Sequence, residues 1–191
     1  MKEALQYAYD LLAHGLDSRH TYHNEFHTFE DVMPAAVYLA GAYGLPDEER
    51  DLLRVGVAFH DIGFTEGPEN HERRGVELVA QVLPGFHFSP VAIEVVAGLI
   101  MATRMPQSPT NLLEQIIADA DLDVLGREDF PVRNALLYQE TLLSGSALGI
   151  DEWLHYQVRF LSDHFYFTQA AREHRDAGKQ RNLAALVERI G

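Results

Sequence analysis

Apolar residues recur in steps of three and four along most of this 191-residue chain, and that spacing places them on one face of an α-helix. Leu5, Tyr9 and Leu12 begin the pattern, and Gly15 is a typical end for the helix that they predict. We find no convincing run of alternating apolar and polar residues, which is the pattern of a strand with one buried face. The chain is therefore predicted to be all-α, with about eight to ten helices joined by short links.

Proline, glycine and capping residues mark where several of these helices begin and end. One helix is expected to open near Asn24 and to end at Gly44. Its predicted buried stripe consists of Phe26, Phe29, Met33, Ala36, Ala40 and Tyr43. Ser89-Pro90 and Ser108-Pro109 each pair a capping side chain with a proline of the first turn, so each predicts a further helix start.

The length and composition fit one folded domain over residues 1–191, because 47% of the residues are hydrophobic and no linker is long enough to split the chain. The formal net charge of −14 argues against a nucleic-acid polymer or an anionic membrane surface as a partner, since both repel an acidic protein. No apolar run has the length of a membrane span or of a signal-peptide core, so we expect a cytoplasmic protein. Composition leaves a homo-oligomer open.

His60 and Asp61 stand at the end of an apolar run that starts at Val57, and Gly63 follows closely. Imidazole nitrogen and carboxylate oxygen both bind divalent cations, so the pair suggests a metal site at the end of a buried helix. A hydrogen-bonded His-Asp pair is the alternative for this dipeptide alone. Because the chain has no cysteine, any metal here is held by nitrogen and oxygen.

A second stretch gathers histidines near the start of a predicted helix. Steps of three, four and four separate its members, which are His20, His23, His27 and Asp31. If this stretch is helical, these side chains share one face, opposite the stripe that contains Phe26 and Phe29. A partly exposed polar face is the alternative interpretation of this stretch.

In a third stretch an apolar helix runs directly into alternating acids, which are Asp119, Asp121 and Asp123. Alternating aspartates also occur in calcium loops. Counted from Asp119, however, the sixth position is Val124 rather than glycine and the twelfth is Phe130 rather than an acid. A carboxylate that reaches into a core site from the end of a helix fits this stretch better.

Taken together, His27, His60-Asp61 and Asp121 resemble, in order and approximate spacing, the HD superfamily of metal-dependent phosphohydrolases between about Tyr22 and Gly126. The resemblance implies an HD-domain helical bundle with a motif core over residues 22–126 and C-terminal helices over residues 129–191. It implies that His27, His60, Asp61 and Asp121 bind a divalent metal ion, either Mn, Co, Ni, Fe, Mg or Zn. Asp119 would then be a neighbouring helix-end carboxylate, and Asp123 is expected to be a solvated turn residue.

The string from Tyr22 to His27 is also similar to the first metal motif of the cyclic-nucleotide phosphodiesterases, a distant branch of that superfamily. The similarity implies that His23 is a general acid that protonates the leaving oxygen, a role that suits imidazole near neutral pH. This chain departs from that branch at Phe64, where another histidine would follow the His-Asp pair. Cyclic-nucleotide specificity is therefore not carried over.

His71 begins a predicted helix and is the one candidate for an additional histidine of a dinuclear site. The helix over residues 91–103 contains no second one, so we favour one metal ion, with His71 facing the substrate phosphate. The cations expected to hold the phosphate are Arg73, Arg74 and Arg104, although each can instead pair with surface acids.

The expected activity is hydrolysis of a small phosphate ester or nucleotide by attack of metal-bound water, with His23 or His71 assisting the leaving oxygen. One alternative is a regulatory module that binds metal and nucleotide without turnover. A second is a di-iron oxygenase-type HD protein, which needs further metal ligands that the sequence lacks.

Overall fold

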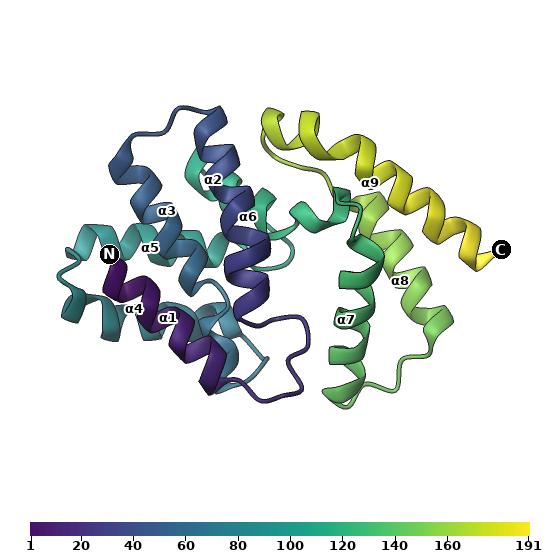
Figure 1. The fold of residues 1–191 in the computed structure, drawn as a ribbon, viewed down its shortest axis with the longest axis horizontal. Helices are drawn as coiled ribbons and strands as arrows, with labels where there is room; N and C mark the ends of the chain where they lie inside the picture. The colour runs from purple at the N-terminus through teal and green to yellow at the C-terminus, as the bar shows by residue number, and fades with distance from the viewer.

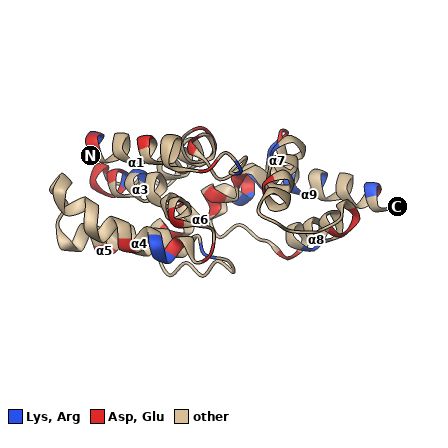
Figure 2. Ribbon diagram, turned by 90° about the horizontal axis from the view of Figure 1, so that it is seen from below, with Lys and Arg blue, Asp and Glu red and all other residues tan.

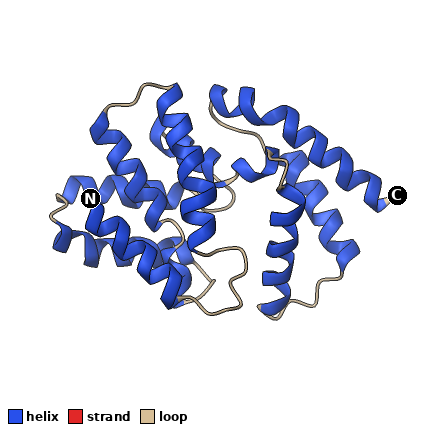
Figure 3. Cartoon of the chain, in the orientation of Figure 1, coloured by secondary structure: helices blue, strands red, loops and turns tan.

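The computed structural model describes residues 1–191 and contains helices joined by short turns, with no strand (Figure 3), so the all-α prediction is confirmed. The α-helices are α1 (Lys2–Gly15), α2 (Met33–Ala42), α3 (Asp47–Phe59), α4 (His71–Val82), α5 (Pro90–Ala102), α6 (Leu112–Asp121), α7 (Phe130–Leu143), α8 (Ile150–Asp163) and α9 (Gln169–Ile190). A π-helical turn, η1 (His27–Val32), and three 3₁₀ turns, η2 (Ile62–Glu66), η3 (Leu83–Phe86) and η4 (Asp123–Gly126), complete the list. None of the helices is both long enough and apolar enough to cross a membrane.

The helices form two groups (Figure 1): α1 to α6 pack together on one side, and α7 to α9 pack together on the other, with η4 between them. Figure 2 shows acidic residues spread over both groups. The second group has its own apolar cluster, which includes Leu125 of η4, Leu161 of α8 and Leu186 of α9. The stretches with the histidines and aspartates of the motif therefore lie in the first group and in η4, the turn that follows α6.

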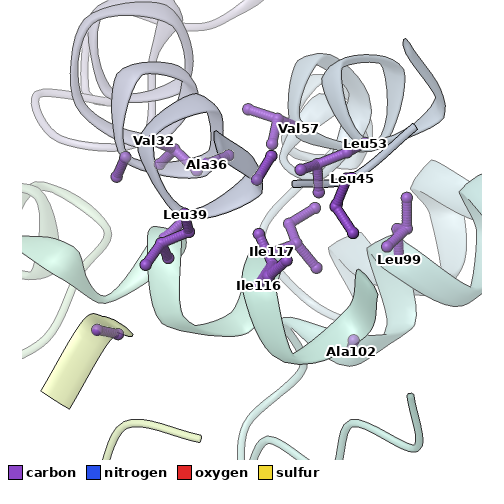
Figure 4. Close-up of a cluster of buried hydrophobic side chains, with 14 of the residues drawn as sticks. Val32, Ala36, Leu39, Leu45, Leu53, Val57, Leu99, Ala102, Ile116 and Ile117 are labelled. Carbon is purple, nitrogen blue, oxygen red and sulfur yellow. The ribbon is translucent and has the colours of Figure 1, made fainter. Parts of the chain in front are cut away.

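The largest apolar cluster lies among α2, α3, α5 and α6 (Figure 4). Ile116 and Ile117 of α6 point towards side chains of α2 and α3 and are fully buried. Because this packing holds α6 against both helices, the C-terminal ends of α3 and α6 come together beside η1. The core thus places three helix boundaries next to one another.

Gly63 allows η2 and α4 to pack backbone against backbone. A Cβ atom built at this position would overlap the carbonyl oxygen of His71 and approach the amide nitrogen of Gly75. Only a residue without a side chain fits here. The glycine after the His-Asp pair therefore brings the first turn of α4 against the residues that end α3.

Three predicted helix starts have different outcomes. Asn24 accepts hydrogen bonds from the backbone N–H groups of Phe26 and His27, and Ser89 accepts one from Ala92, so both predicted caps are confirmed. The prediction from Ser108-Pro109 was wrong. Asn111 caps α6 instead, with its Oδ1 3.0 Å from the N–H of Glu114.

The predicted buried stripe of the helix after Asn24 was partly wrong. Ala36 and Ala40 are buried, but Phe26 is 50% exposed, while His27 and Asp31 face the interior. The π-helical turn η1 separates Phe26 from Ala36 and Ala40, and its wider turn changes the register between the residues before and after it relative to an α-helical pattern. Sequence periodicity at 3.6 residues per turn cannot show that change.

Candidate metal centre and the adjoining cavity

Four side chains from three helix boundaries converge on one point. Asp121 Oδ1, at the end of α6, lies 3.2 Å from His27 Nε2 and 3.4 Å from His60 Nε2. Asp61 Oδ2 lies 3.3 Å from His60 Nε2 and 3.7 Å from His27 Nε2. Ligand atoms of His27, His60 and Asp121 all lie within 4.8 Å of one another, which is the spacing of groups that can share one metal ion. The structure therefore brings together all four residues predicted as ligands.

The ring of His60 is oriented with one nitrogen directed at the cluster. Its Nδ1 lies 2.8 Å from the carbonyl oxygen of Val57, which can only accept a hydrogen bond, so Nδ1 carries a proton. Nε2 is buried and has no partner of acceptable hydrogen-bond geometry, and neither has Asp61 Oδ2. Buried polar atoms without partners are costly, and this set of nitrogen and oxygen donors fits a divalent cation.

The histidines and carboxylates of the cluster shift one another's pKa values. Burial opposes protonation of His60, but Asp61 and Asp121 outweigh burial and raise the pKa of His60 well above its usual value. Burial favours the neutral form of Asp61, yet the neighbouring histidines, His60 foremost, hold the pKa of that carboxyl far below its usual range. Each carboxylate thus favours a positive charge beside it, and a divalent cation would compete with a proton for that place.

Asp31 lies behind His27 and links it to two arginines. His27 Nδ1 is 3.8 Å from Asp31 Oδ2, while Arg127 and Arg133 each place a guanidinium nitrogen 2.7 Å from the Asp31 carboxylate. Burial alone would raise the pKa of Asp31, but His27 and the arginines lower it overall, so this carboxylate keeps its charge. Both arginines follow the metal-binding stretches in the chain, so sequence spacing gave no sign of the pairing.

His23 is held by a carboxylate from α7. Its Nδ1 lies 2.5 Å from Glu140 Oε1, and Glu140 Oε2 accepts hydrogen bonds from the backbone N–H groups of Tyr22 and His23. Glu140 is buried, which would raise its pKa, but His23 and these N–H groups lower it overall. His23 therefore has Nδ1 engaged and Nε2 left for the cavity that it lines.

His71 lies at the entrance of α4 beside the cluster. Its Nε2 is 3.6 Å from both Asp61 Oδ1 and Glu72 Oε1, and its ring stacks on Phe64 at 4.0 Å. Both His71 and Glu72 line the same cavity as His23. Glu72 is buried, and sequence reasoning did not select it because a single acid in a helical first turn is ordinary.

A cavity of about 280 Å³ opens beside the cluster and is bounded by both helix groups. Its polar end contains His23, His27, Asp61, His71 and Asp121. The apolar wall comes mainly from η4, α7 and α8, and includes Leu122, Val124, Leu125, Phe130, Leu137, Tyr156 and Phe160. The further polar lining residues are Glu72, Thr103, Arg133, Asn134 and Gln157.

None of the three arginines predicted to hold phosphate lines this cavity. Arg74 donates to the carbonyl oxygens of Glu66 and Gly67, Arg73 is exposed, and Arg104 lines a separate surface hollow. The first turn of α4 directs His71 and Glu72 at the cavity, so the next two residues face elsewhere. The one arginine of the cavity wall is Arg133.

The other aspartates of the third stretch have structural contacts. Asp119 accepts hydrogen bonds of 2.7 Å from the backbone N–H groups of both Phe167 and Thr168, and so ties α6 to the start of α9. Asp123 was expected to be solvated, and that expectation was wrong. It is buried and lies 2.6 Å from Arg175 Nε, because η4 packs closely against α9.

Comparison with known proteins adds two findings. The HD domain family model matches residues 27–123, which include all four converging side chains. The fold is similar to the crystal structure of a predicted HD superfamily hydrolase from an uncultured Thermotogales bacterium, with 21% sequence identity and a TM-score of 0.62 over 100% of this chain and 88% of that one. No curated protein matches the sequence. The similarity between the two structures extends over α7 to α9, beyond the matched family segment.

Proposed function

Because this chain belongs to the HD domain family of metal-dependent hydrolases, we propose that it is a phosphohydrolase that acts on a small phosphate ester or nucleotide. The proposal rests mainly on the orientation of the His60 ring. The Val57 carbonyl holds the proton of Nδ1, so Nε2 is presented to the same point as His27 and Asp121. We propose one divalent ion per chain, held by His27, His60, Asp61 and Asp121, with Mn, Co, Ni, Fe, Mg and Zn as the candidates.

A cation is also needed for the site to accept phosphate. Asp61, Glu72 and Asp121 all line the cavity, and their negative charge would repel a phosphate group at short range. The only arginine in the wall, Arg133, is already paired with Asp31. When bound, a divalent ion supplies Lewis acidity, which polarises a phosphoryl oxygen and lowers the pKa of water.

The protein's own side chains supply the proton and the positioning. His23 is oriented by Glu140, so its Nε2 is available to give a proton to the leaving oxygen. His71 Nε2 lies near Asp61 Oδ1, whereas His27 and His60 lie near Oδ2, so we propose that His71 donates a hydrogen bond to a phosphate oxygen. The surrounding apolar wall excludes water from the organic part of the substrate and strengthens these electrostatic contacts.

The test compares metal content and hydrolysis in one set of variants. We expect His60→Ala and Asp121→Ala each to lose bound metal, measured by elemental analysis, together with at least a roughly hundredfold loss of turnover on a panel of phosphate esters. The matched control is His155→Ala, since His155 is exposed on α8 and lies outside the cavity.

Hydrolysis that persists in the chelated protein would contradict the proposal. A metal content of one ion without turnover on any ester would favour the regulatory alternative. Two ions per chain with oxygen consumption would favour the di-iron alternative.

A further inference from the structure

The C-terminal helices supply the part of the cavity that is farthest in sequence from the metal-binding motif. The family match ends at residue 123, whereas the apolar wall includes Phe130 and Leu137 of α7 and Phe160 of α8. Tyr156 and Phe160 lie one turn apart on α8 with nearly parallel rings, at an interplanar angle of 17°. A flat organic group fits such a wall, because aromatic rings stack on planar ligands.

Two buried carboxamides in this wall have no role within the protein. Asn134 of α7 is 8% exposed, and its Oδ1 is buried without a hydrogen-bond partner. Gln157 of α8 is 3% exposed and lines the same cavity, and its side chain makes no hydrogen bond within the chain. A buried polar group without a partner loses its hydration without compensation, and Asn134 Oδ1 is such a group. The Gln157 carboxamide adds a second unpaired polar group on the same wall, so the two side chains together indicate a ligand that hydrogen-bonds to them.

The chemistry of the carboxamide limits the kind of group that can bind. Each one offers a carbonyl acceptor and an NH₂ donor, so the pair matches an uncharged, planar group that has both donors and acceptors on its edge. A nucleobase has these properties, whereas a sugar or an aliphatic chain lacks the flat face. An anionic organic group would find no free cationic side chain here, because Arg133 is paired with Asp31.

The charges of the cavity also limit the number of phosphates. Arg133 is the only Lys or Arg among the lining residues, so there are no additional cations for the second and third phosphates of a nucleoside triphosphate. The volume of about 280 Å³ lies at the small end of the range for ligand pockets, which suits one base and its sugar.

We propose that Asn134 and Gln157 bind the base of a nucleoside monophosphate whose phosphate lies at the metal centre. The proposal rests on the phosphohydrolase function proposed above and adds the substrate class and two specificity-determining residues. It assigns the selection of the substrate to α7 and α8, and the reaction itself to η1 and to the C-terminal ends of α3 and α6.

The test measures hydrolysis of nucleoside monophosphates and of 4-nitrophenyl phosphate by the metal-loaded full chain. We expect Asn134→Ala and Gln157→Ala each to lower kcat/KM for the preferred nucleotide roughly tenfold to hundredfold, the effect of removing one or two hydrogen bonds to a substrate. Hydrolysis of 4-nitrophenyl phosphate and metal content should stay within about twofold, because that ester has no base edge to recognise. Gln169→Ala, at an exposed position of α9, is the matched control.

Equal losses on both substrates would overturn the proposal, since they would show that the two residues maintain the fold rather than select the substrate. A wild-type chain that prefers nucleoside triphosphates or 4-nitrophenyl phosphate over every monophosphate would overturn it as well.

If no ester is hydrolysed, the proposed function fails, and calorimetric binding of the same nucleoside monophosphates decides the present inference separately. Binding that weakens at least tenfold in both variants would support it, and unchanged or absent binding would overturn it.

Discussion

At the scale of single residues, the site depends on side chains that hold other side chains in place. Asp31 lies next to Nδ1 of His27, and Glu140 pairs with Nδ1 of His23. For His60 the partner is a backbone carbonyl, that of Val57. Partners of this kind fix the tautomer and the direction of an imidazole ring, and removing them typically costs metal affinity or rate without removing a ligand. The roles of the partners can therefore be separated from the roles of the histidines.

Glu140→Gln tests the partner of His23. Glutamine keeps the shape and can still accept from the N–H groups of Tyr22 and His23, but its NH₂ group cannot accept the Nδ1 proton of His23. We expect kcat to fall roughly tenfold to hundredfold, within the range of general-acid effects, while metal affinity stays unchanged. Steady-state kinetics and metal titration give the two readouts. A variant with full kcat would show that Glu140 serves only to attach α7 to the first helix group.

At the scale of elements, the site exists because helix boundaries meet. The backbone contact between η2 and α4 is one of these junctions, and the position of Gly63 there has no room for a Cβ atom. That contact places His71 and Glu72 next to Asp61. The π-helical turn η1 has a similar effect on the other side, because it turns both His27 and Asp31 inward.

Gly63→Ala tests the junction of η2 and α4. The added methyl group must push the first turn of α4 away, and overpacking of this kind costs about 1–3 kcal/mol or more of unfolding free energy. Denaturant unfolding measures that loss, and hydrolysis should fall with it because His71 moves away from Asp61. Gly41→Ala is the matched control. No atom lies within 4 Å of its added Cβ and it occupies a helix, so it should be neutral or stabilise by up to ~1 kcal/mol. Equal effects of the two substitutions would contradict this account.

At the scale of the whole molecule, the two helix groups contribute different parts of one cavity. The first group holds the four converging side chains, and the second supplies Glu140, Arg133 and most of the apolar wall. The buried contacts of Asp31 with Arg127 and Arg133 connect the groups next to the site. A chain cut after the family-matched segment would therefore lack both the partner of His23 and the wall that we assign to the substrate base.

The stability of the molecule should also depend on pH through His164, which lies between α8 and α9. Burial, followed by the charge of Lys179, lowers the pKa of His164 from 6.5 to about 4. Because the unfolded chain takes up this proton below about pH 6.5 and the folded chain only below about 4, unfolding is favoured increasingly between these values.

We expect the wild-type chain to lose ~2–3 kcal/mol more unfolding free energy between pH 7 and pH 4 than His164→Gln, at about 1.4 kcal/mol per pKa unit. Chemical denaturation across that range measures the difference between the two proteins. Parallel curves for wild type and variant would show that His164 does not contribute.

Much of the fold and the four converging side chains could be predicted because their signals are local. Apolar spacing predicted the helices, Asn24 and Ser89 predicted two of the caps, and each ligand-type residue stood at the boundary of an apolar segment. The helix start predicted at Ser108 was wrong because several residues near a helix start can cap it. The tertiary structure has Asn111 as the capping residue. The three predicted phosphate-binding arginines were chosen by closeness in sequence, which does not determine the face of α4 that a side chain occupies.

By itself, then, the sequence determined that this is an all-α chain with histidine and aspartate side chains at the ends of buried helices. Helix periodicity and capping act over a few residues and can be read from them. Only the tertiary structure decided that Glu140 holds His23, that Asp31 pairs with two arginines, and that Asn134 and Gln157 face the cavity. These contacts join residues far apart in the chain, and a buried Glu, Asn or Gln looks like any other helical residue until packing places it beside its partner.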